Sequence, residues 1–267
     1  MKEVTCKTII TKSKLPTVDY SCNLYIGCTH SCTYCYAEFM KRFTGHISKK
    51  WGTFVDYKIN AVEVLRKEIK KIERDKWLFL GSVTDTYQPV EEKLNLTREC
   101  LKIFLEHQQS ISILTKSDLV TRDIDLFSKF DNIEVGMSIS YIDERFSKLK
   151  LGATKISGRI QALKELKNAN IKTYAFIGPI IPQITNLEEI FSLIGQDVDF
   201  VMGETLNLKF ASLNEFKILL IGFCGSREAA NIIKLCKSEK YSNEIKSEFE
   251  SLCDKYSIEN RGFFVHV

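Results

Sequence analysis

One stretch decides how this chain of 267 residues folds and acts: Gly27-Cys28-Thr29-His30-Ser31-Cys32-Thr33-Tyr34-Cys35-Tyr36. It places three cysteines at spacings of four and three residues. Thiolates are natural ligands of iron–sulfur clusters, and a compact loop can bring three of them to three iron atoms. The fourth iron of a [4Fe–4S] cluster then has no protein ligand and is open to a small molecule. We therefore expect Cys28, Cys32 and Cys35 to bind such a cluster.

A structural zinc site is the alternative for these cysteines. Such sites normally close four ligands around the metal, often as two separated pairs. The sequence has no second Cys-x-x-Cys pair, and His30 lies between two of the cysteines, where simultaneous coordination is awkward. The pattern therefore favours iron–sulfur chemistry, and a non-catalytic iron–sulfur or zinc-binding module remains the alternative.

The other cysteines do not form a comparable motif. A disulfide framework is not expected, because the count of nine is odd and no export signal precedes them. An auxiliary cluster on Cys224, Cys236 and Cys253 is conceivable, but their loose spacing on expected helices favours burial in the core. Cys100 fits the inner side of its helix and is also expected in the core.

Composition bounds the class of protein. The chain is 44% hydrophobic and 27% charged, as in globular proteins, and its net charge of +4 permits an acidic substrate without demanding nucleic acid. No run of about eighteen apolar residues is present, so no membrane span is expected. The start of the chain lacks the apolar stretch of a signal peptide, and we expect a cytoplasmic protein.

Short β-rich runs alternate with amphipathic segments along most of the chain. Strands are expected at 23–27, 77–81, 111–115, 133–140, 172–178 and 199–203, and helices at 60–73, 94–106, 123–130, 157–169 and 186–194. Ser157 is a plausible N-cap, and Asn186 with Glu189 fits a capping box. The alternation predicts βα units around a parallel sheet.

Six such units are enough for an open α/β structure, a partial (β/α)6 barrel, whose chemistry sits at the carboxyl ends of the strands. The pattern changes near residue 212, and we expect a core at 1–211 with a short helical extension at 212–267 packed on it. The extension is expected to contain helices at 213–223 and 239–256 and a final strand at 262–267.

The motif Cys-x₃-Cys-x₂-Cys, with an aromatic residue before the last cysteine, resembles the signature of the radical SAM superfamily. The wider stretch from Asn23 to Ala37 resembles the branch of spore photoproduct lyase and the DNA repair photolyase-like proteins. Weaker matches follow in the expected order at residues 81–91, 114–117, 137–140 and 178–182. The resemblance therefore runs from about residue 20 to about residue 210.

This resemblance implies a mechanism. S-adenosylmethionine (SAM) would chelate the open iron, and an electron from the reduced cluster would cleave it to methionine and a 5′-deoxyadenosyl radical, which abstracts hydrogen from a substrate. It also implies an electron donor such as flavodoxin or ferredoxin. A nucleic-acid base is the suggested substrate, although no recognition module is evident; a peptide or a small metabolite remains open.

The resemblance also implies where SAM binds. Tyr34 would lie near the adenine. The family often has a Gly-Gly-Glu-like segment after the second strand, whereas this chain has Gly81-Ser82-Val83-Thr84-Asp85 there. Ser82, Thr84 and Asp85 are accordingly the candidates for the SAM amino group, and the sequence does not choose among them.

Three further polar residues follow expected strands. Lys116 could neutralise the SAM carboxylate, and Ser138 and Ser140 could bond the ribose or the carboxylate. For each of them, a strand-end or turn role is the alternative. Arg159 could also reach the carboxylate, but a solvated helix arginine is favoured.

Two residues are weak catalytic candidates. Cys22 could return a hydrogen atom to a substrate radical, a role known in the lyase branch, and a small buried residue is the alternative. Tyr87 could contact substrate or relay a radical, with turn packing beside Pro89 as the alternative. His266 receives no role.

Overall fold

The computed structural model describes residues 1–149, 152–209 and 213–266. An eight-stranded sheet has the order β11-β10-β9-β8-β7-β6-β3-β2, and every neighbouring pair runs parallel except β2 with β3. The strands are β2 (Ile10–Lys12), β3 (Tyr20–Cys22), β6 (Leu78–Leu80), β7 (Ile111–Thr115), β8 (Ile133–Ile139), β9 (Lys172–Ile180), β10 (Phe200–Thr205) and β11 (Glu259–Phe264).

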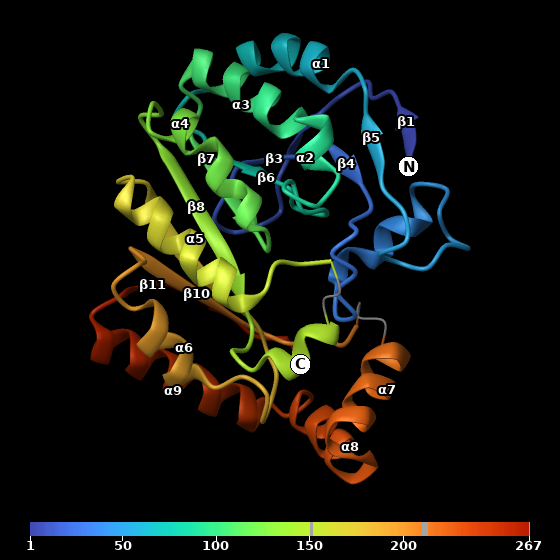
Figure 1. Ribbon diagram of the computed structural model, residues 1–267, viewed down its shortest axis with the longest axis vertical. Coiled ribbons are helices and arrows are strands. Elements are labelled where there is room, and N and C mark those ends of the chain that lie inside the picture. The colour runs from blue at the N-terminus through green and yellow to red at the C-terminus, as the bar shows by residue number, and fades with distance from the viewer. Residues whose placement is uncertain (150–151, 210–212, 267) are drawn as a thin grey trace.

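Helices follow the outside of this curved sheet (Figure 1). They are α1 (Ala61–Glu68), α2 (Glu91–Leu94), α3 (Leu96–His107), α4 (Ile124–Phe127), α5 (Ile156–Asn168) and α6 (Leu187–Ile194), with the 3₁₀ helices η2 (Ile69–Lys71) and η3 (Asp118–Asp123). Parallel strands joined by outer helices make the α/β partial barrel that the sequence predicts.

Side chains alternate between the two faces of each strand, and this alternation separates two cores. Val201 on β10 belongs to the main core between the sheet and its helices. Phe200 and Met202 on the same strand belong to a smaller cluster inside the barrel, together with Tyr174 and Phe176 of β9. The interior face of β10 and β9 is therefore largely aromatic.

The first barrel strand differs from the prediction of residues 23–27. Tyr20–Cys22 pairs with β6, and the chain then leaves the sheet, because the Asn23 amide bonds to Ser82 and to the Val83 N–H. The next strand, β4 (Tyr25–Ile26), joins a separate three-stranded sheet with β1 (Lys2–Val4) and β5 (Asp56–Lys58).

The helix caps agree with the prediction in one case only. The Asn186 side chain accepts a hydrogen bond from the Glu189 N–H at 3.1 Å, as the capping box requires. The Ser157 cap is wrong: α5 starts at Ile156, one residue earlier, and Lys155 occupies the N-cap position with no side-chain hydrogen bond.

The C-terminal part contains α7 (Leu213–Cys224), α8 (Ser226–Leu235) and α9 (Glu239–Tyr256). The sequence did not predict α8, which starts after Gly225 at a φ of 80°. The last strand lies at Glu259–Phe264 rather than 262–267 and extends the sheet beside β10. The expected boundary at 211/212 and Val267 lie outside the described residues, and the division into core and extension stays a prediction. No helix among the described residues is long and apolar enough to span a membrane.

Candidate functional site

The three motif cysteines lie in a loop after β3 and β4, and the 3₁₀ helix η1 (Tyr36–Arg42) follows it. Cys28 and Cys32 are buried, with exposures of 8% and 9%, and Cys35 is half-buried; none forms a disulfide. In the partial barrel this loop lies where the first strand ends, at the face that carries chemistry in such folds.

The Cys28 and Cys35 thiols both have raised pKa values. Burial, with added contributions from Asp85, Cys32 and Cys35, raises the pKa of the Cys28 thiol well above its ordinary value. Burial, followed by Cys32, raises the pKa of Cys35 to about 12. Thiols in such surroundings become thiolates only beside a strong positive charge, which bound iron supplies. The donor set therefore fits an iron–sulfur cluster.

No group of three or more His, Cys, Asp or Glu side chains is placed to share one metal ion within the described ranges. A [4Fe–4S] cluster makes a different demand, since its three thiolates bind three separate irons.

The segment after β6 grips the start of the cysteine loop. The Thr84 hydroxyl donates to the Gly27 carbonyl at 2.6 Å, and the Gln88 amide donates to the same carbonyl at 3.3 Å. The Gln88 oxygen also accepts from the Thr29 N–H at 3.0 Å, and the whole side chain is fully buried. Sequence reasoning missed Gln88, because its partners lie about sixty positions away and no local pattern marks them.

Asp85 holds the middle of the loop. Its Oδ2 lies 3.1 Å from Nδ1 of His30, between the first two cysteines. The Thr115 hydroxyl donates to Asp85 Oδ1 at 2.7 Å, and the Lys116 N–H donates to Oδ2 at 2.9 Å. Burial alone would raise the pKa of Asp85, but His30 and these hydrogen bonds outweigh it and lower the pKa. The carboxylate expected to meet SAM is thus engaged by the protein itself.

Ser82 is engaged in the same way. Its hydroxyl accepts from the Asn23 amide at 3.0 Å, and its carbonyl accepts from the Tyr36 hydroxyl. Ser82, Thr84 and Asp85 therefore all position the cysteine loop in this structure.

A second segment closes over the opposite side of the loop. The Thr33 N–H donates to the carbonyl of Leu149, the last residue of η4 (Glu144–Leu149), at 3.0 Å. The Gly152 N–H donates to the His30 carbonyl at 3.2 Å. A side chain at Gly152 would collide with the Thr29 carbonyl, so only glycine allows this approach.

Arg159 corrects the sequence expectation of a solvated arginine. It is 2% exposed, and its guanidinium donates to the Ser138 carbonyl at 2.9 Å. Its Nε has no hydrogen-bond partner among the described residues. The Ser138 and Ser140 hydroxyls donate to the Gly178 carbonyl at 3.3 and 2.6 Å, which ties β8 to β9 beside this cation.

The other predicted SAM residues lie near the loop. Lys116 is half-buried, and its charge acts on the Cys35 thiol. Tyr34 is 7% exposed and packs in an apolar cluster with Cys32 and Tyr141, so the chain itself covers its ring. Stacking of Tyr34 on adenine stays a prediction.

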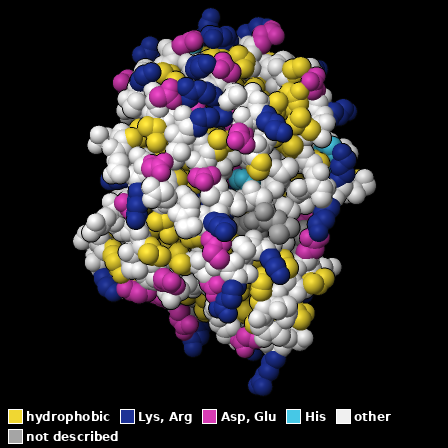
Figure 2. All heavy atoms as spheres, in the orientation of Figure 1, with side chains coloured by type: hydrophobic (Ala, Val, Ile, Leu, Met, Phe, Trp, Pro, Cys, Tyr) yellow, Lys and Arg dark blue, Asp and Glu magenta, His cyan; other side chains and the backbone are white. Residues whose placement is uncertain are grey.

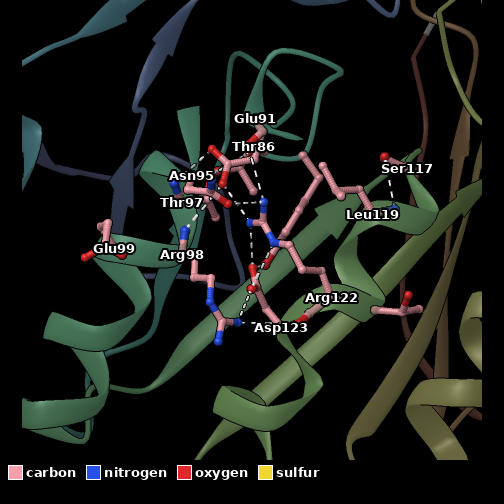
Figure 3. A network of polar contacts seen from close by, with 12 residues as sticks. Thr86, Glu91, Asn95, Thr97, Arg98, Glu99, Ser117, Leu119, Arg122 and Asp123 are labelled. Carbon is pink, nitrogen blue, oxygen red and sulfur yellow. Dashed lines mark hydrogen bonds and ion pairs between the residues drawn. The ribbon is translucent and has the colours of Figure 1, made fainter. Parts of the chain in front are cut away.

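The two weak catalytic candidates lie outside the barrel interior. Cys22 is fully buried in the main core, where burial raises the pKa of its thiol to about 12. Tyr87 donates to Asp123 at 2.9 Å. Figure 3 shows the network around Asp123, in which Arg122 lies between Glu91 and Asp123. The burial of Cys22 matches its packing alternative, whereas the Tyr87 phenol bonds to Asp123, a partner that the sequence did not indicate. A catalytic role for either residue stays a prediction.

The C-terminal cysteines do not gather. Cys224 is exposed, Cys236 lies in the apolar cluster beside Tyr34, and Cys253 lies in the main core. His266, which received no role, is paired with Glu204 at 2.8 Å.

Comparisons with known proteins agree with this geometry. A family model described as the Radical SAM superfamily matches residues 22–194. An uncharacterized protein of Methanocaldococcus jannaschii is 39% identical over 216 residues, or 80% of each chain. A protein of Pseudomonas phage M6 named Radical SAM Nalpha-GlyT isomerase is 23% identical over 164 residues, which are 61% of this chain and 33% of the phage protein.

Solved structures show the same fold. A cysteine-to-serine mutant of spore photoproduct lyase matches with a TM-score of 0.68 at 14% identity, covering 99% of this chain and 81% of the lyase chain. Spore photoproduct lyase complexed with dinucleoside spore photoproduct gives a TM-score of 0.68 at 13% identity and the same coverage.

Proposed function

Because this chain belongs to the radical SAM superfamily, we propose that Cys28, Cys32 and Cys35 bind a [4Fe–4S] cluster whose open iron takes SAM. Held by these cysteines and reduced by a donor, the cluster would supply the electron that splits SAM into methionine and a 5′-deoxyadenosyl radical, which would abstract hydrogen from the substrate. The observation that carries the proposal is a loop with three free, largely buried thiols, held on both sides by hydrogen bonds to its backbone.

Two cations suit the carboxylate of SAM. Lys116 is close enough to Cys35 to act on its charge, and Arg159 is buried with one N–H group unpaired among the described residues. A carboxylate compensates a buried guanidinium through charge-assisted hydrogen bonds. We therefore assign Arg159 and Lys116 to the carboxylate, with Ser138 and Ser140 fixing the strand ends beside them.

The residues after β6 receive a different part in the proposal. Ser82, Thr84 and Asp85 would support the cluster loop rather than meet SAM through their side chains, since those side chains already bond to the protein.

The proposed reaction is lyase-like, with a nucleic-acid base as substrate. Supporting this is the fold shared with spore photoproduct lyase, which was solved in complex with dinucleoside spore photoproduct. Figure 2 shows Lys and Arg interspersed with Asp and Glu over the visible face, so that face carries no broad basic patch of the kind that binds long nucleic acid tightly. A peptide or small metabolite is the competing substrate, and the flavodoxin or ferredoxin donor and the cytoplasmic location stay predictions.

Anaerobic incubation with SAM and dithionite tests the chemistry. We expect 5′-deoxyadenosine and methionine in equal amounts from the reconstituted protein. A protein that carries zinc, or a cluster with a fourth side-chain ligand, and releases no 5′-deoxyadenosine would contradict the proposal.

Deuterium transfer tests the substrate. Candidate nucleosides, dinucleotides and peptides labelled at carbon are incubated with the enzyme, and deuterium in 5′-deoxyadenosine identifies the compound that reacts. Transfer from peptides alone would replace the nucleic-acid proposal with its competitor.

A further inference from the structure

A carboxylate–imidazole pair lies where the last two strands of the barrel end. Glu204 on β10 lies in register with Phe264 on β11, and its Oε1 is 2.8 Å from Nε2 of His266. The Glu204 side chain is 29% exposed and that of His266 31% exposed. The His266 N–H also donates to the Thr205 hydroxyl at 2.8 Å, which fixes the chain just beyond β11.

The neighbours of His266 determine which of its two ring nitrogens carries the proton. The Asn207 Oδ1 accepts from the Lys209 N–H at 3.0 Å, so the Asn207 amide nitrogen faces Nδ1 of His266, at 3.2 Å. An amide nitrogen only donates, so Nδ1 is the acceptor and the ring proton lies on Nε2, directed at Glu204. The pair thus keeps Glu204 in one orientation. Its second oxygen, Oε2, has no partner in the part of the chain that the structure describes.

Glu204 faces the inside of the barrel. Alternation along β10 puts it on the face of Phe200 and Met202, in the aromatic interior cluster. Its Cβ and the ring of Phe176 both lie against Gly178, whose carbonyl accepts the hydroxyls of Ser138 and Ser140. A fixed carboxylate therefore stands beside the Phe176 ring, and one strand, β9, separates β10 from the end of β8 where Ser138 and Ser140 lie.

Glu204 and the cluster loop lie at the same end of the barrel. Glu204 is near the carboxyl end of β10, and the loop follows the carboxyl end of β3, which runs in the same direction as β10. The carboxylate is thus on the side of the barrel mouth where a radical would form.

We infer that Glu204 is a substrate-binding residue that accepts a hydrogen bond from a ring N–H of the substrate, with His266 and Asn207 as its positioning residues. This inference rests on the proposed function. A planar ring can lie against the half-buried rings of Phe176 and Phe264, and a carboxylate oxygen beside them selects rings that carry an N–H donor. Nucleobases with an imide or amino edge have both properties.

The test measures binding of thymidylyl-thymidine to the anaerobic holoenzyme with SAM bound, by equilibrium dialysis. The matched probe is the same dinucleotide methylated at both N3 positions. For the native protein we expect N3-methylation to weaken binding about tenfold, the range of a hydrogen bond to a charged group. Glu204→Gln should weaken binding of the unmethylated probe by a similar factor, and methylation should add little in this variant.

The positioning residues have a separate readout. His266→Ala should reduce the preference for the unmethylated probe, and His266→Gln, which retains an N–H donor, should restore part of it. Glu189→Gln on the exposed start of α6 is the control and should keep the full preference. Iron content and the circular dichroism spectrum of each variant confirm that the fold is kept.

Three results would overturn the inference. These are equal effects of methylation in the native protein and in Glu204→Gln, a loss of SAM affinity rather than dinucleotide affinity in Glu204→Gln, or native binding of both probes weaker than about 1 mM. The proposed function is judged separately, because native protein that cleaves SAM but ignores the dinucleotides sinks only this inference.

Discussion

Two buried polar regions of this molecule differ in how completely their groups are paired. Around Asp123, Arg122 bridges to Glu91 at 2.7 Å and to Asp123 at 2.9 Å, and Arg98 reaches Asp123 at 2.6 Å (Figure 3). Tyr87 adds a further donor to Asp123. This region, which we call the Asp123 network, satisfies its charges with the protein alone.

The cysteine loop and its surroundings, in contrast, contain buried polar groups that the protein does not pair. His30 Nε2, Thr33 Oγ1 and Arg159 Nε are buried without a hydrogen-bond partner among the described residues. Leaving such a group unpaired costs about 1–3 kcal/mol. A folded protein retains that cost where a ligand removes it, so complete pairing marks scaffold and incomplete pairing marks the binding site.

The largest effect is expected at the cysteines themselves. Changing Cys28, Cys32 or Cys35 to Ala should abolish the brown absorbance of the cluster and all SAM cleavage, because each of these changes removes the only protein ligand of one iron. Iron content and 5′-deoxyadenosine measure both effects. Cys253→Ala, in the main core, is the matched control and should keep near-normal iron. If the C-terminal cysteines also lower iron by about half, an auxiliary cluster must be considered again.

The next effect is on stability, in the Asp123 network. Asp123→Asn removes the fully buried carboxylate that Arg98 and Arg122 share, while Arg122 keeps Glu91 and Arg98 keeps Asp125 as partners. Losing these charged hydrogen bonds should cost about 1.5–3 kcal/mol. Urea unfolding of the apo protein measures it. Asp125→Asn removes a half-exposed partner of Arg98 and should cost about 0–1 kcal/mol. If both changes cost the same, the Asp123 network is not the scaffold that its pairing indicates.

Arg159→Gln should affect ligand binding more than stability, which is the reverse of Asp123→Asn. Losing the guanidinium should weaken SAM binding about tenfold to a hundredfold, the range of charge-assisted hydrogen bonds. The free energy of unfolding of the apo protein should fall by no more than about 1 kcal/mol, because the change removes one hydrogen bond to the Ser138 carbonyl but also removes a buried Nε group that is unpaired among the described residues. Dialysis of SAM against reconstituted protein measures the affinity, with the exposed Arg66→Gln as control. A variant that loses stability but binds SAM normally would make Arg159 part of the scaffold.

The sequence predicted what local spacing encodes. The strand at Ile111–Thr115 and the helix at Glu239–Tyr256 match the predicted ranges, because their apolar patterns and caps are local. The cysteine motif is local too. The contacts of Thr84 and Asp85 with the cysteine loop were not predictable, since their partners lie more than fifty residues earlier. A polar residue that follows a strand is equally suited to binding a ligand and to holding a neighbouring loop.

Burial was harder to predict for charged residues than for apolar ones. Arg159 lies on a helix that follows a strand, and the positions around it on that helix are solvated. The sequence therefore favoured an exposed side chain. Instead it turns under the end of β8 to the Ser138 carbonyl. The Glu204–His266 contact joins positions 62 apart through the pairing of β10 with β11, which no periodicity in either segment reveals.

The smallest effect is expected at Cys22. This residue tests whether a fully packed position belongs to the scaffold, as the comparison of the two regions indicates. Its thiol is fully buried beside Cys100 in the main core, away from the interior cluster of the barrel. Cys22→Ala should cost about 1 kcal/mol in urea unfolding, the usual loss for removing a small buried group. SAM cleavage and the return of hydrogen to the substrate should match the native enzyme, as seen by solvent deuterium in the product. Loss of that deuterium without loss of 5′-deoxyadenosine would make Cys22 the hydrogen donor, and would show that a fully packed position in this fold can still take part in the chemistry.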